Sequence, residues 1–164
     1  MKTLSALYLR FCDLVSWLKS PFLLFVRLYW GWQFAQSGWG KLHHLDNVTD
    51  FFTTLHIPLP GLTAHFVASL EFVGGILLIL GLGTRLIGLI LTVNMFVAYL
   101  TASRDALLAF FSDPGKFYKD DAYTFLFAAL LAFLFGAGAI SIDALLARRY
   151  RGAAVAPDVN RNIP

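Results

Sequence analysis

The sequence predicts an all-α membrane protein, in which a four-transmembrane-helix bundle is preceded by an amphipathic helix lying along the bilayer surface. Of the 164 residues, 58% are hydrophobic and only 14% are charged, whereas soluble domains contain about 25% charged residues. The chain also contains four apolar stretches, each close to the roughly 20 residues that a helix needs to cross a bilayer. The composition excludes a disordered chain. The net charge of +3 is typical of basic loops that orient a membrane protein. We do not interpret it as a signal for nucleic-acid binding, and we expect no nucleic-acid partner.

Residues 1–20 show a helical alternation of apolar and polar residues. The apolar members recur at three- and four-residue steps: Leu4, Leu7, Tyr8, Phe11, Leu14, Val15 and Leu18. This periodicity is typical of an interfacial helix. A cleaved signal peptide is the alternative, although Arg10 and Asp13 interrupt the apolar core that it would need. Pro21 is expected to separate this helix from the first span, because proline disrupts a helix interior.

The four apolar stretches define one transmembrane domain over residues 21–143. The predicted spans are residues 22–42, 62–82, 84–103 and 122–142. Only Gly81 to Arg85 separates the second span from the third, so these two spans should be antiparallel neighbours. Residues 144–164 are predicted to form a basic segment and a flexible tail. Ser141 or Asp143 can cap the first amides of that segment.

The loops differ in charge, and this difference predicts the topology. Basic residues gather at both termini and at the 81–85 hairpin, whereas the loops near 43–61 and 104–121 contain many acidic residues. Basic loops stay in the cytoplasm. We therefore expect a multi-pass protein with both termini in the cytoplasm.

Few polar side chains fall inside the spans, and these form a candidate site. Arg27 and Glu71 are ionisable, and Gln33 and Asn94 are expected near the depth of Glu71. An unpaired charge at the bilayer centre costs about 2.5–3.5 kcal/mol, which predicts an Arg27–Glu71 ion pair between the first two spans. Glu71 could instead be protonated, since burial disfavours a charged carboxylate. The pair could simply fix the helix register, or serve a proton-coupled ligand such as a quinone head group. Transport of a small solute is the third interpretation of these buried charges.

Small residues accompany the charges on both helices. They are Gly31 and Gly38 in the first span, and Gly74 and Gly75 in the second. Because glycine lets helix backbones approach closely, these stripes predict tight packing of the first two spans, or a cleft for a flat ligand.

Metal and redox chemistry have weak support in the residues. A single cysteine, Cys12, excludes an intrachain disulfide. His43, His44 and His65 are weak candidates for metal or haem ligands, because their spacing fits no zinc pattern. The expectation is no metal site, and ordinary hydrogen bonding for these rings. If electrons pass through this protein, the carrier should be a quinone or a cofactor of a partner.

The order of the motifs resembles the DoxX family. The matching motifs are Arg27-x3-Gly31-x2-Phe34-x3-Gly38-x2-Lys41, then Glu71-Phe72-Val73-Gly74-Gly75, then residues 80–85 with Arg85, and finally Gly136 to Asp143. The resemblance covers about residues 22–145. The sequence departs from the family at both ends, and at Ala139, where the family often has a basic residue.

This resemblance implies a four-helix protein of the bacterial inner membrane that is associated with redox enzymes. It marks Lys41, Arg85 and Asp143 as motif charges. Relatives include a membrane subunit of thiosulfate:quinone oxidoreductase. The expected function is thus an integral membrane subunit linked to thiol, sulfur or quinone oxidoreductase chemistry, with a redox protein as partner. The alternative is a non-catalytic scaffold or assembly factor. A homodimer is an open alternative for the oligomeric state.

Overall fold

The computed structural model describes residues 2–154, and these residues contain helices and no strand. The helices are α1 (Lys2–His43), α2 (Leu45–Thr54), α3 (Pro60–Leu80), α4 (Thr84–Thr101), α5 (Arg104–Leu108), α6 (Pro114–Tyr118), α7 (Asp121–Phe135) and α8 (Ile142–Ala154). The all-α class predicted from the sequence is confirmed.

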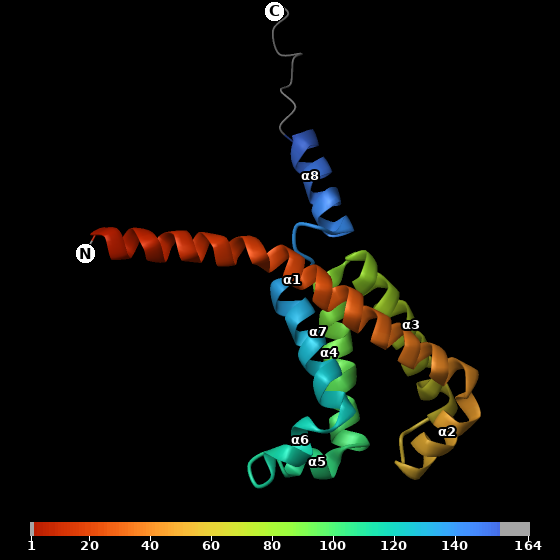
Figure 1. Cartoon of the computed structure of the whole chain (residues 1–164). Coiled ribbons are helices and arrows are strands. Elements are labelled where there is room, and N and C mark those ends of the chain that lie inside the picture. The colour runs from red at the N-terminus through yellow and green to blue at the C-terminus, as the bar shows by residue number, and fades with distance from the viewer. Residues whose placement is uncertain (1, 155–164) are drawn as a thin grey trace, which may run out of the picture.

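The long helices are arranged as two closely packed pairs. Helix α1 packs along α3, and α4 packs along α7, while smaller contacts join α3 to α4 and α1 to α7 (Figure 1). A buried apolar core lies between the pairs and contains Phe34, Leu78, Leu91, Met95, Ala129 and Ala132. The core therefore draws on all four long helices.

The two ends of the bundle differ in their connections (Figure 1). At one end, which we call the hairpin end, lie the α3–α4 turn, the start of α8 and the N-terminal half of α1. Hydrogen bonds join these parts: the Asp143 amide donates to the Gly81 carbonyl, and the Ala139 amide donates to the Ser20 hydroxyl. The opposite end, which we call the loop end, carries α2, α5 and α6.

Helix α1 does not break at Pro21, so the predicted separation of residues 1–20 from the first span is wrong. The helix runs without interruption from Lys2 to His43, with Pro21 inside it. A proline lacks its own amide hydrogen bond, but just after it Leu23 and Val26 are buried against the bundle. That burial favours continuing the helix. Before Pro21 the helix projects beyond the bundle (Figure 1), and whether it lies on a bilayer surface stays a prediction.

The fourth apolar helix is shorter than the sequence suggested. Helix α7 ends at Phe135, where the predicted span continued to residue 142. Gly136 follows with φ 72° and ψ −161°, a conformation that terminates the helix, and the chain stays irregular up to α8. Fifteen helical residues span about 22 Å, which is less than the roughly 30 Å hydrocarbon core of a bilayer.

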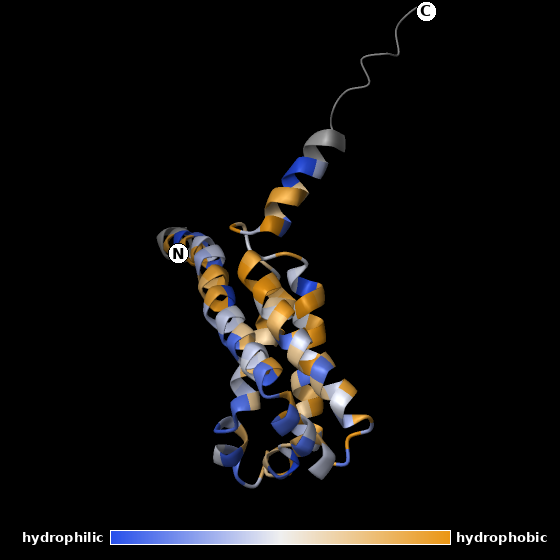
Figure 2. Ribbon diagram, turned by 90° about the vertical axis from the view of Figure 1, so that its right-hand side faces the viewer, coloured by the Kyte–Doolittle hydropathy of each residue, from blue (hydrophilic) through white to orange (hydrophobic). Residues whose placement is uncertain are grey.

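Two of the described helices are long and apolar enough to cross a membrane. They are α3 and α4, whose bounds lie within two residues of the predicted second and third spans. Only 33% and 28% of their apolar windows are buried inside the protein. Figure 2 shows hydrophobic residues along much of the helices of the bundle, and Phe66 on α3 and Val93 on α4 are among those that are more than half exposed. Because a soluble protein would cover such helices, this exposure favours a lipid environment. The four-span arrangement itself stays a prediction.

Candidate functional site

Glu71 lies at the centre of a polar cluster inside the bundle. It is on α3, where its residue is 1% exposed. Lys41, from the last turn of α1, places its Nζ 2.6 Å from Oε1 and 2.5 Å from Oε2 of Glu71. A charge-assisted contact to both oxygens is among the strongest that a carboxylate can make. The negative charge of Glu71 is therefore compensated within the protein.

Two neutral side chains complete the surroundings of this carboxylate. The Ser37 hydroxyl donates to Oε2 over 2.9 Å, and the Asn94 amide donates to Oε1 over 3.3 Å. Ser37 and Lys41 are four residues apart on α1, so both reach the same face. Asn94 is on α4. The carboxylate thus connects three helices, and we call Ser37, Lys41, Glu71 and Asn94 the Glu71 cluster.

Glycines allow the helices to come close enough for this cluster. A Cβ added to Gly75 would lie 2.5 Å from the Gly31 carbonyl oxygen and from the Ala35 amide nitrogen. A Cβ on Gly38 would lie 2.6 Å from the Ala68 carbonyl oxygen. Such distances are shorter than van der Waals contact, so only glycine fits at these crossings.

Gly74 has a different neighbour from Gly75. It faces α4, where an added Cβ would lie 3.2 Å from the Leu91 side chain. The two adjacent glycines of α3 therefore serve two different helix contacts, Gly75 with α1 and Gly74 with α4.

The predicted Arg27–Glu71 ion pair is wrong. Arg27 is 2% exposed, but its Nη2 donates to the Ile140 carbonyl over 2.5 Å, and Glu71 is paired with Lys41 instead. The register of α1 against α3 explains the difference. Ser37 of α1 lies level with Glu71 of α3, and Arg27 lies ten residues before Ser37 on α1. That is about 15 Å along the axis, farther than one arginine side chain spans.

The remaining predicted polar residues lie apart from the cluster. Gln33 is half-buried and makes no hydrogen bond to the described residues. The Nδ1 atoms of His43 and His44 interact with the Trp39 and Gly40 carbonyls near the end of α1. His65 is exposed. Among residues 2–154, no group of three or more His, Cys, Asp or Glu side chains could hold a metal ion.

Asp143 and Arg85 both lie at the hairpin end. The oxygens of Asp143 accept hydrogen bonds from the amides of Gly83 and Thr84, over 2.7 and 2.9 Å. Asp143 therefore caps the first turn of α4, where a negative charge is favourable. The cap of α8 is Ser141, whose hydroxyl accepts from the Ala144 amide over 3.1 Å. Of the two predicted caps for this segment, only Ser141 has that role.

Sequence reasoning missed two members of the Glu71 cluster. The family motif marks Lys41 as a charge but does not indicate that it pairs with Glu71, and no sequence pattern marks Ser37. A signal was available, because Lys41 shares the helix face of Gly31 and Gly38. Glycines that meet across a helix crossing fix the register, and that register brings Lys41 to the carboxylate.

The arrangement can hold and move a proton. The Lys41 side chain is 32% exposed whereas that of Glu71 is 2% exposed, so Lys41 connects the buried carboxylate with the surface near the loop end. A carboxylate, an ammonium and a hydroxyl in direct contact are suitable groups for general acid–base transfer.

These features define the class of the protein as a helical membrane protein. Two of its apolar helices are largely exposed, and charged side chains are buried between its helices. The chain belongs to the DoxX family, whose sequence model matches residues 22–104. The family is membrane-associated.

A relative from Bacillus subtilis (strain 168), named "Putative oxidoreductase CatD", is 30% identical over 83 residues. The match covers 51% of this chain and 60% of that relative, so the chain spans less than two thirds of the relative's length. No solved structure gives a significant match.

Proposed function

We propose that this protein is the multi-pass inner-membrane subunit of an oxidoreductase, and that its Glu71 cluster exchanges protons with a quinone. Membership of the DoxX family and the similarity to a protein named as an oxidoreductase support the link to redox chemistry. The single observation that carries the site is the buried Glu71 carboxylate, which contacts Lys41, Ser37 and Asn94.

The chemistry assigns a role to each member of the cluster. Oxidation of a quinol to a quinone releases two protons and two electrons. The Glu71 carboxylate accepts the protons of the two quinol hydroxyls one after the other, and the partly exposed Lys41 passes each proton on to water before the next is taken. Ser37 and Asn94 keep the carboxylate in position. The electrons go to a redox-active partner protein, because the sequence has a single cysteine and no nucleotide-binding pattern.

The orientation in the membrane follows from the charges at the two ends. The hairpin end carries basic residues such as Arg85 and Arg148, which favours the cytoplasmic side. The loop end, with the acidic segments around α2 and α5, would then face outside. In this orientation α3 and α4 are full spans, α1 crosses from residue 22 onward, and the shorter α7 completes the bundle. Lys41 would connect Glu71 with the outer surface.

A binding measurement tests the proposed site. The wild-type protein and the variants Glu71→Gln, Lys41→Met and Arg27→Leu are purified in native-like lipid, and binding of a short-chain quinone is measured by quenching of tryptophan fluorescence. We expect about tenfold weaker binding for the first two variants and unchanged binding for Arg27→Leu. Equal binding by all four folded proteins would refute the quinone site.

A non-catalytic scaffold is the second candidate, and two exposed helices favour it. The N-terminal half of α1 and most of α8 project from the bundle (Figure 1). Leu7, Leu14 and Trp17 on α1 are each at least 60% exposed, so this segment offers a surface for a partner protein. A homodimer is the simplest assembly in which two such surfaces could meet.

Crosslinking in native membranes separates the two candidates. A scaffold should crosslink through residues 7–18 to a stoichiometric partner, and the Glu71→Gln variant should keep both that partner and the activity of the complex. Loss of quinol-dependent activity in Glu71→Gln, with the complex intact, would contradict a purely scaffolding role. Absorption spectra of the native complex, with analysis of its lipid extract, would identify haem, flavin or bound quinone.

A further inference from the structure

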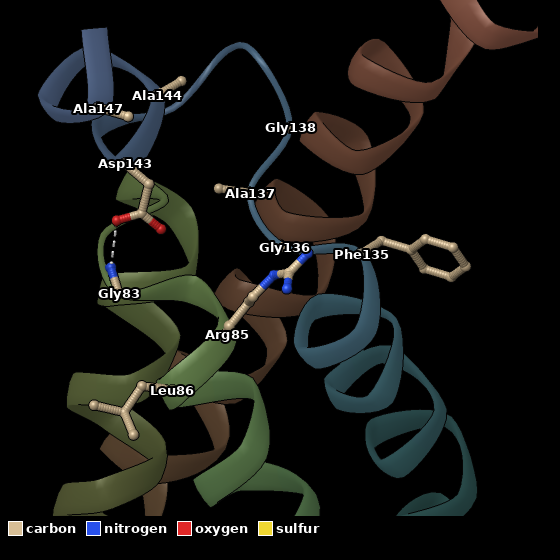
Figure 3. Close-up of a pocket in the computed structure, with 10 residues that line it drawn as sticks. All are labelled: Gly83, Arg85, Leu86, Phe135, Gly136, Ala137, Gly138, Asp143, Ala144 and Ala147. Carbon is tan, nitrogen blue, oxygen red and sulfur yellow. Dashed lines mark hydrogen bonds between the residues drawn. The ribbon is translucent and has the colours of Figure 1, made fainter. Parts of the chain in front are cut away.

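A pocket with a volume of about 530 Å³ opens at the hairpin end. It lies between the start of α4, the irregular segment that follows α7, and the start of α8 (Figure 3). We call it the hairpin-end pocket. The Glu71 cluster is some ten residues away along α3, so this pocket is separate from the proposed quinone site.

The pocket contains a positive charge that has no ion-pair partner among residues 2–154. Arg85 lines it and makes no ion pair with any described residue. A Cβ on Gly136 would lie 3.0 Å from the Arg85 Nε, so glycine leaves room for the guanidinium beside the backbone (Figure 3). The amides of Ala137 and Gly138, which also line the pocket, donate to no other described group. The pocket lining therefore contains two backbone donors that have no acceptor among the described residues.

The one acidic group of the pocket is already engaged. Both oxygens of Asp143 accept hydrogen bonds from the α4 amides of Gly83 and Thr84. Figure 3 shows its carboxylate turned toward Gly83. Its charge is compensated by the positive end of α4.

Further basic residues lie around the rim. The Lys19 Nζ lies 5.5 Å from the ring centroid of Phe135, which lines the pocket. Arg148 lies four residues, about one helical turn, after Ala144, which lines the pocket from α8. The surroundings of the pocket are therefore positive, and they suit an anion.

The flank of the pocket is apolar and faces outward. Leu86 is 63% exposed and Phe135 is 48% exposed. Both belong to helices whose outward faces suit lipid tails. A basic centre beside an exposed apolar flank matches a molecule with a negative head and hydrocarbon chains.

We propose that the hairpin-end pocket binds the headgroup of an anionic phospholipid. The phosphate contacts Arg85 and the free amides, and the acyl chains lie along Leu86 and Phe135. A zwitterionic headgroup fits less well, because its ammonium would need the carboxylate of Asp143, which is already bonded to two amides. The proposal does not depend on the quinone site.

Lipid binding can be measured by native mass spectrometry of the full chain released from detergent. The probes are phosphatidylglycerol, phosphatidylethanolamine and phosphatidylcholine. Arg85→Gln is the test variant, and Arg104→Gln is its matched control, because Arg104 is also an exposed arginine but lies at the loop end. Thermal unfolding in the same detergent shows whether each variant is folded.

We expect the wild-type protein to prefer phosphatidylglycerol. Arg85→Gln should weaken that binding about five- to tenfold, Arg104→Gln should leave it unchanged, and Lys19→Gln should show a smaller loss. Equal losses for the two arginine variants, or equal binding of phosphatidylethanolamine, would overturn the proposal. Displacement of the lipid by inorganic phosphate at an equal concentration would also overturn it, because the site would then bind a free oxyanion.

Discussion

Glu71 and Arg27 are both buried charges, 1% and 2% exposed, yet their surroundings differ. Glu71 contacts three partner residues, including the opposite charge of Lys41. Arg27 donates one hydrogen bond to the Ile140 carbonyl, and its Nε and Nη1 have no partner among the described residues. Burial alone therefore does not reveal a site. The surroundings of Glu71 stabilise a charge, whereas Arg27 connects α1 to the segment before α8.

The different surroundings of Glu71 and Arg27 depend on the register between α1 and α3. Replacing a glycine at the crossing of these helices should disturb that register most. Gly75→Leu would place a side chain against the backbone of Gly31 and Ala35. We expect a loss of about 3 kcal/mol in the free energy of unfolding, because overpacking forces the helices apart. Unfolding by SDS in mixed micelles measures this loss. Gly40→Leu is the control, since nothing lies within 4 Å of a Cβ there. Equal effects would show that α1 and α3 are not in close contact.

The pairing of Glu71 is tested by two double-mutant cycles. Glu71→Gln is combined with Lys41→Met in one cycle and with Arg27→Met in the other. The first should give a coupling of about 2 kcal/mol, because the two charges are in contact, and the second a coupling near zero, because the sites are distant. Unfolding free energies of the single and double variants supply both values. Coupling only in the second cycle would restore the Arg27–Glu71 pair.

At the hairpin end, the cap on α4 should have a medium effect. Asp143→Ala removes the acceptor for the Gly83 and Thr84 amides, and the expected loss is about 1 kcal/mol. Hydrogen exchange at these two amides should accelerate. Asp121→Ala is the comparison variant, because the Asp121 side chain is exposed and makes no hydrogen bond to a described residue. Unchanged exchange at Gly83 and Thr84 would exclude the cap.

Arg27→Met should have the smallest effect, although Arg27 is as buried as Glu71. Methionine removes a charge that makes only one hydrogen bond to the described residues, with the Asp143 carboxylate as its nearby opposite charge, and keeps an apolar side chain of similar length. The expected loss is less than about 1 kcal/mol, because an incompletely satisfied buried charge contributes little net stability. SDS unfolding compares it with Glu71→Met, for which the loss should be clearly larger. The reverse order would mean that Arg27 is the better compensated charge.

Part of the architecture could be predicted because it depends on local composition. The apolar runs gave α3 and α4 to within two residues, since bilayer thickness sets helix length. The tight turn at residues 81–85 followed from two glycines, Gly81 and Gly83, both of which have positive φ. The continuation of α1 through Pro21 and the early end of α7 were not predicted. Packing of the residues after Pro21 outweighed the local pattern in α1, and the backbone conformation of Gly136 outweighed it in α7.

The sequence by itself determined that the protein is helical and apolar, that it carries the DoxX motifs, and that Arg27 and Glu71 are the charges to be explained. It did so because hydrophobic periodicity and glycine spacing are local properties of the chain. Only the tertiary structure decided which residue compensates Glu71 and which helix Asp143 caps. Both depend on the register between helices: Ser37 and Lys41, which lie ten and fourteen residues after Arg27 on α1, contact Glu71 in place of Arg27.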